Sequence, residues 1–167
     1  MSCLDKLTFF EKWLEKNPSL WKRKAEDISV PDDFEYLFGR SINPTYLEFL
    51  QKLGAFFLIP MEGQNPPVYD YETLTPSEMM SDFNENIIRW NNPVCDFDFG
   101  YMMPFCRDRT AGWFYCFDIK FQGVNDLPVV LFDPMCAIPG DELKIATTFI
   151  DWLKLLAKYN NLSGGKL

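Results

Sequence analysis

The stretch MMPFCRDRTAGWFYCFD, residues 102–118, decides the fold. Two apolar runs flank the polar turn RDRTAG, and this spacing predicts two neighbouring antiparallel strands. The second run, WFYCF, lacks the alternation of a half-exposed strand and is far shorter than the ~20 residues that cross a membrane. We therefore expect a central strand covered on both faces. The alternative is that its aromatic side chains line an apolar ligand pocket.

Further strands and helices are predicted on both sides of this hairpin. Buried strands are expected in AFFLIP (55–60) and PVVLFD (128–133), and CDFDFGY (95–101) alternates like a strand with one acidic face. Helical spacing of apolar residues predicts helices near 4–14, 30–39, 43–54 and 75–90, and a long closing helix with Asp141 and Glu142 in its first turn. The order predicts one α+β domain, an antiparallel, possibly mixed, sheet meander surrounded by helices, with a frayed tail at 160–167.

The composition argues against catalysis. The chain has no histidine, which removes the usual bases and nucleophile partners, and its five cysteines show no C-x-x-C spacing. Asp118 and Asp133, each at the end of an expected strand, could act as an acid–base pair, but such acids more often make turns. We expect no enzyme, no cofactor and no metal. The absence of a secretory leader or membrane-length run predicts a cytoplasmic protein without a membrane partner.

Negative charge is concentrated in the middle of the chain. The net charge is −8, and residues 62–98 hold eight acids against a single base, Arg89. Such a field repels nucleic acid and attracts basic partners, although it can equally be a solvated face that keeps the protein soluble. The candidate partner-binding residues are Glu62, Asp70, Glu72, Glu78, Asp82, Glu85, Asp96 and Asp98.

Three segments, in order, resemble the SUKH superfamily, the group of fungal cell-wall-assembly regulators and many bacterial immunity proteins. They are FGRSINPTYLEFLQKLGAF (38–56), MMPFCRDRTAGWFYCFD (102–118), and LPVVLFDP with ATTFIDWLKLLA (127–134 and 146–157). The resemblance spans residues 32–157 of a single SUKH-like domain, 1–167, and covers the acidic middle, 60–98, poorly. Leu53-Gly54 stands where the family often has Asn-Gly.

The resemblance implies a sheet ringed by helices, no catalytic residues, and a role in binding another protein. Bacterial members commonly bind and block a cognate toxin, often a nuclease or a deaminase, in the cytoplasm. We therefore expect an immunity protein whose partner is a basic toxin domain. The alternative is a housekeeping interaction or scaffold protein of the same fold, and a carboxylate enzyme ranks last. The oligomeric state is left open. Charge reversal at Asp82, Glu85, Asp96 and Asp98 is expected to slow association with the partner.

Overall fold

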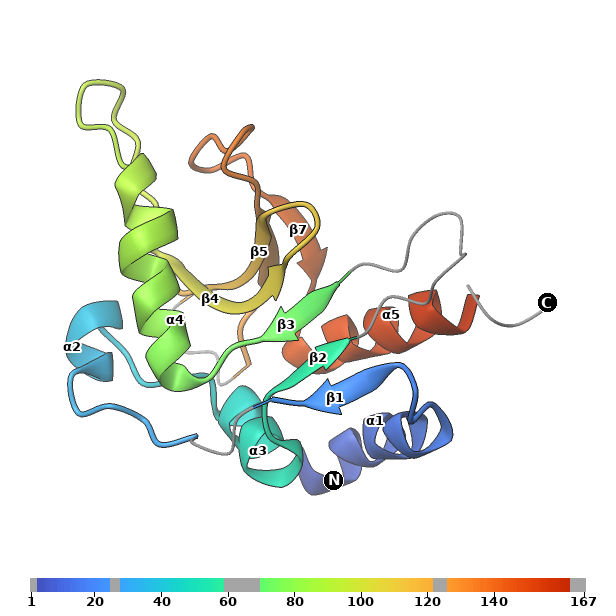
Figure 1. The fold of residues 1–167 in the computed structure, drawn as a ribbon. Coiled ribbons are helices and arrows are strands. Elements are labelled where there is room, and N and C mark those ends of the chain that lie inside the picture. Colours follow the sequence, from blue (N-terminus) through green and yellow to red (C-terminus); the bar gives the residue numbers. More distant parts are fainter. Residues whose placement is uncertain (1–2, 25–27, 59–69, 122–125, 163–167) are drawn as a thin grey trace.

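The computed structural model describes residues 3–24, 28–58, 70–121 and 126–162 (Figure 1). The helices are α1 (Cys3–Lys16), α2 (Phe34–Phe38), α3 (Pro44–Leu53), α4 (Pro76–Asp82), the π-helical η1 (Phe83–Ile87), the 3-10 helical η2 (Ile88–Trp90) and α5 (Phe149–Leu162). The strands are β1 (Trp21–Arg23), β2 (Phe56–Leu58), β3 (Tyr71–Thr73), β4 (Met102–Asp108), β5 (Trp113–Asp118), β6 (Val129–Phe132) and β7 (Leu143–Ala146).

The seven strands form one sheet in which spatial order follows chain order, β1 to β7, and every pairing is antiparallel. This arrangement confirms the predicted α+β domain built on an antiparallel meander, and no strand pair is parallel within the described residues. The hairpin of β4 and β5 is the longest pairing. It runs from Met102 opposite Asp118 to Asp108 opposite Trp113.

Helices cover the sheet on both faces (Figure 1). On one face, α1, α3 and α5 pack together, and the α3 residue Tyr46 and the α5 residue Phe149 meet Phe105 and Phe117 of the central strands through aromatic rings. On the other face, the helical segment from α4 to η2 crosses β4, and α2 packs against α4. The sheet is therefore the middle of three layers.

Because helices cover both faces of the sheet, β5 carries bulky side chains without alternation. Phe117 faces α3 and α5, whereas Phe114 meets Phe132 on the opposite face. Phe114, Cys116 and Phe117 are buried, so apolar residues are needed in both directions. The prediction of a central strand covered on both faces is confirmed.

A bulge shapes β4. The register with β5 shifts between Pro104 and Cys106, so Phe105 is the extra residue. Proline has no N–H to give to a strand ladder, which makes a bulge the natural place for Pro104 in a central strand. The ring of Phe105 is fully buried and stacks on Phe117 with centroids 4.3 Å apart.

The strand predicted at 95–101 is wrong. This segment is a turn that closes through an isolated bridge between Asn92 and Phe97. The side chain of Asn91 accepts from the N–H of Phe99 at 2.7 Å, and Asp96 takes a left-handed φ of 56°. Asn and Asp tolerate that conformation and bond nearby backbone groups, so they favour turns over ladders.

The closing helix also begins later than predicted. Asp141 precedes β7, Glu142 adjoins it, and α5 starts only at Phe149. The strand β7 takes the place of the expected first turn because it pairs with β6. At the other end α5 runs to Leu162, so the predicted tail is helical over its first three residues, and the remainder lies outside the described residues.

Within the described residues, no helix is long and apolar enough to cross a membrane.

Candidate protein-binding surface

The acidic candidates from residues 62–98 divide into two groups with different surroundings. Glu62 lies outside the described residues. Four of the others take part in ion pairs, and three are exposed. The paired residues are Asp70, Glu72, Glu78 and Asp82. The exposed residues are Glu85, Asp96 and Asp98.

Lys24, which follows β1, forms ion pairs with two of these acids. Its Nζ lies 2.5 Å from Glu72 Oε1 in β3 and 2.6 Å from Glu78 Oε1 in α4. The Lys24 and Glu72 side chains are 10% and 8% exposed, so water screens this pair poorly. The contact ties the first strands of the sheet to the start of α4.

Glu78 also completes the capping box of α4. Its carboxylate accepts from the backbone N–H of Thr75 at 2.8 Å, while Thr75 Oγ1 accepts from the N–H of Glu78. Burial alone would raise the pKa of Glu78, but the hydrogen bonds from Lys24 and Thr75 outweigh burial and lower this pKa below its usual value. The carboxylate of Glu78 is therefore already bound within the fold.

Asp82, a candidate for contact with a partner, lies at the end of α4 and is buried. Its carboxylate accepts from Arg107 Nη2 of β4 at 2.7 Å and from Asn86 Nδ2 at 2.9 Å. Burial raises the pKa of Asp82 above its ordinary value, and the Arg107 and Asn86 hydrogen bonds oppose that rise. Charge reversal at Asp82 would therefore change the stability of the fold, so its effect on association would not report on a binding surface.

Asp70 and Arg109 form a more exposed pair at the far end of β4. Arg109 Nη2 donates to Asp70 Oδ2 at 2.7 Å, and its guanidinium lies over the ring of Phe57, 4.9 Å from the centroid. The three basic residues Lys24, Arg107 and Arg109 thus form ion pairs with four of the eight acids. The acidic middle of the chain is not one negative face.

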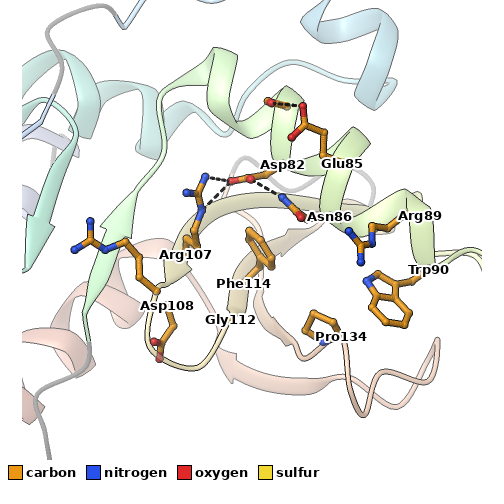
Figure 2. Close-up of a pocket in the computed structure, with 12 residues that line it drawn as sticks. Asp82, Glu85, Asn86, Arg89, Trp90, Arg107, Asp108, Gly112, Phe114 and Pro134 are labelled. Carbon is orange, nitrogen blue, oxygen red and sulfur yellow. Dashed lines mark hydrogen bonds and ion pairs between the residues drawn. The ribbon is translucent and has the colours of Figure 1, made fainter.

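A groove lies between the helical segment 81–90 and the hairpin of β4 and β5 (Figure 2). Its volume is about 560 Å³. The ion pair between Arg107 and Asp82 lies on one side, and Phe114 forms part of its wall. At the other end, Trp90 faces Pro134, and the Arg89 guanidinium lies 5.4 Å from the Trp90 ring centroid.

The π-helical turn η1 helps to set the positions of Arg89 and Trp90 at the end of the groove. A π turn holds one more residue than an α turn, which rotates all later side chains about the helix axis by about 100°. It buries Phe83 and Ile87 against the core and is followed by Arg89 and Trp90 at the groove. Nothing in the periodicity of the sequence distinguishes this turn from ordinary helix.

The exposed acids lie on η1 and on the turn that follows η2. Glu85 accepts from Ser81 Oγ, and Asp98 Oδ1 accepts from the N–H of Gly100 at 2.8 Å. Asp96 and Asp98 belong to the turn that follows Trp90, and neither forms an ion pair with a described residue. Of the seven candidates that the structure describes, these three are exposed and form no ion pair with a described residue.

A second loop, between β6 and β7, was missed by the sequence analysis. It carries Asp133, Asp141 and Glu142 and no basic residue, and it lies beside the turn at 91–101. The N–H of Gly140 donates to Tyr101 Oη at 3.2 Å, and Phe99 packs edge-on against Phe132. The available signal was the run DPMCAIPGDE, which is acidic and rich in proline and glycine.

The two strand-end acids act in turns. Asp118 Oδ1 accepts from the N–H of Lys120 at 3.0 Å, and Asp133 Oδ1 accepts from the N–H of Met135 at 2.9 Å. These are the local bonds by which aspartate stabilises a turn. In the part of the chain that the structure describes, no group of three or more His, Cys, Asp or Glu side chains is arranged to hold a metal ion.

A seven-stranded antiparallel meander between two helical layers defines an α+β domain. The sequence profile of the SMI1 / KNR4 family (SUKH-1) matches residues 24–155, and the chain belongs to this family. The match includes the acidic middle that the resemblance covered poorly. A comparison with curated proteins gave no match. Membership fits an immunity or regulatory module that binds another protein.

Proposed function

We propose that this chain is a non-catalytic protein-binding module that neutralises a cognate bacterial toxin in the cytoplasm. The observation that carries the proposal is the match to the SMI1 / KNR4 family (SUKH-1) over residues 24–155. The toxin is a nuclease or a nucleic-acid deaminase, and the module blocks it by occupying the surface that its substrate needs. No chemical step by the module is required.

The distribution of charge supports a basic partner. Enzymes that act on nucleic acids carry basic clefts because their substrates are polyanions. The exposed residues Glu85, Asp96 and Asp98 leave negative charge on the surface, two of them on the turn after η2, and that charge favours encounter with a basic cleft. The same charge disfavours nucleic acid as a direct partner.

Co-expression tests the proposal. A bacterial host would express the toxin domain encoded beside this chain's gene, with and without the chain. We expect that the chain restores growth and that it forms a stable complex with a catalytically inactive form of the toxin domain on size-exclusion chromatography. Growth arrest despite full expression of the chain, together with the absence of a complex, would refute toxin neutralisation.

The matched control is a chain with a damaged core, in which Phe105→Ala removes a buried ring that stacks on Phe117. This variant should lose several kcal/mol of stability, roughly 3–5 by analogy with other buried phenylalanines, and should fail to protect. If no toxin gene lies beside the chain's gene, the scaffold alternative of the same fold is favoured.

A further inference from the structure

Large apolar side chains are exposed mainly at one end of the molecule. Five of the eight such residues in the described chain lie in two segments, 90–98 and 133–143, which we call the loop surface. They are Trp90, Val94, Met135, Ile138 and Leu143. Val94 is 92% exposed and Met135 is 85% exposed, so neither contributes to the core. Apolar groups gathered in this way indicate a contact site for another molecule.

The two segments form one continuous region. Trp90 and Pro134 line the same groove, and Gly140 donates to Tyr101 next to the first segment. Both loops project from the same end of the molecule (Figure 1). Backbone bonds to the side chains of Asn91, Asn92 and Asp98 hold the first loop in shape, so little ordering is needed on binding.

The two segments of the loop surface carry only negative charge, while Arg89 and Lys144 flank them in the sequence and Lys120 lies over the Tyr101 ring. The loop surface carries five acids, Asp96, Asp98, Asp133, Asp141 and Glu142, and no lysine or arginine. None of the five forms an ion pair with a described residue. An apolar centre with unpaired acids around it complements a protein face that presents an apolar side chain among lysines and arginines.

We infer that the loop surface docks a basic protein face with an apolar anchor, and that this anchor meets Val94 and Met135 beside the groove. The inference rests on the proposed function, because it identifies the surface that would contact the toxin. It moves the binding residues away from Asp70, Glu72, Glu78 and Asp82, and it adds the segment 133–143.

Two exposed cysteines allow a direct test on the unmodified chain. Cys95 and Cys136 lie on the two loops, whereas Cys106 and Cys116 are buried. Alkylation of Cys95 and Cys136 by N-ethylmaleimide would be followed by mass spectrometry in the presence of a synthetic Lys/Leu peptide. A Glu/Leu peptide and a Lys/Ser peptide of the same length serve as controls. We expect the Lys/Leu peptide to slow both alkylations most.

Variants test the apolar contact. Val94→Glu with Met135→Glu should remove the protection by the Lys/Leu peptide and weaken binding of the toxin domain by about tenfold or more. Tyr36→Glu, at a residue that is 93% exposed on α2, should leave both unchanged. Circular dichroism would confirm that all variants fold.

The outcomes separate the two proposals. Equal protection by the Glu/Leu peptide, or no protection at either cysteine, would overturn the docking surface. A toxin complex whose affinity is unchanged in the double variant would also overturn it, while leaving toxin neutralisation intact. Protection by the Lys/Leu peptide without growth rescue would support the surface and reject the toxin as its partner.

Discussion

Tyr46 shows what a single residue contributes beyond its place in a pattern. Helical spacing identifies it as an inward-facing residue of α3, and it is fully buried. Its hydroxyl donates to the carbonyl oxygen of Leu74 at 2.6 Å and also lies 3.0 Å from that of Phe105. Burial raises the pKa of Tyr46 well above its usual value, so the hydroxyl remains a donor. The sequence predicts the burial, but bonds to residues 28 and 59 positions away depend on the assembled sheet.

Replacing this hydroxyl should cost stability. Tyr46→Phe leaves the Leu74 carbonyl without its side-chain donor in a buried site, so we expect the free energy of unfolding to fall by about 1–2 kcal/mol. Urea denaturation would measure the change. Tyr36→Phe is the matched control, because that tyrosine is 93% exposed and should change stability by less than about 0.5 kcal/mol. Equal effects of the two substitutions would contradict the role of the Tyr46 hydrogen bond.

At the scale of elements, segments with a clear local pattern could be predicted, even the three-residue β2, whereas β1, β3 and β7 could not. The helix α3 has all its signals in the sequence: Asn43 accepts from the N–H of Tyr46, Pro44 begins the helix, and Gly54 ends it with a φ of 76°. The strands β1 and β3 have three residues each. Strands of that length are fixed by pairing with neighbours, which a local pattern does not contain.

The ion pairs that connect elements could not be predicted from the sequence either. Lys24→Met would leave Glu72 and Glu78 without their ammonium partner, and Glu72 is buried. We expect a loss of roughly 3 kcal/mol in the free energy of unfolding, as for other buried ion pairs with one partner removed. Lys52→Met is the matched control: its pair with Glu11 is more exposed, so it should cost no more than about 1 kcal/mol. A loss at Lys24 as small as at Lys52 would refute the structural role of the pair.

At the scale of the whole molecule, the sequence shows where the excess charge lies along the chain but not which acids form ion pairs. The acidic middle reads as one patch along the chain, whereas folding pairs four of its acids with Lys24, Arg107 and Arg109. The free acids Asp96 and Asp98 then share one end with a loop from much later in the chain. Only the three-dimensional arrangement of the meander brings these two segments together.

The most direct test of a basic partner on the loop surface is the association rate with the toxin domain as a function of salt. Asp96→Asn with Asp141→Asn removes two charges there, and asparagine tolerates the left-handed φ at position 96. Asp32→Asn with Glu35→Gln removes two exposed charges near or on α2 and leaves the same net charge.

We predict that the loop-surface variant associates several-fold more slowly than wild type at low salt, that its rate falls less steeply as salt rises, and that the difference disappears by about 0.5 M salt. The α2 variant should remain close to wild type. Identical rates for both variants at every salt concentration would contradict the account.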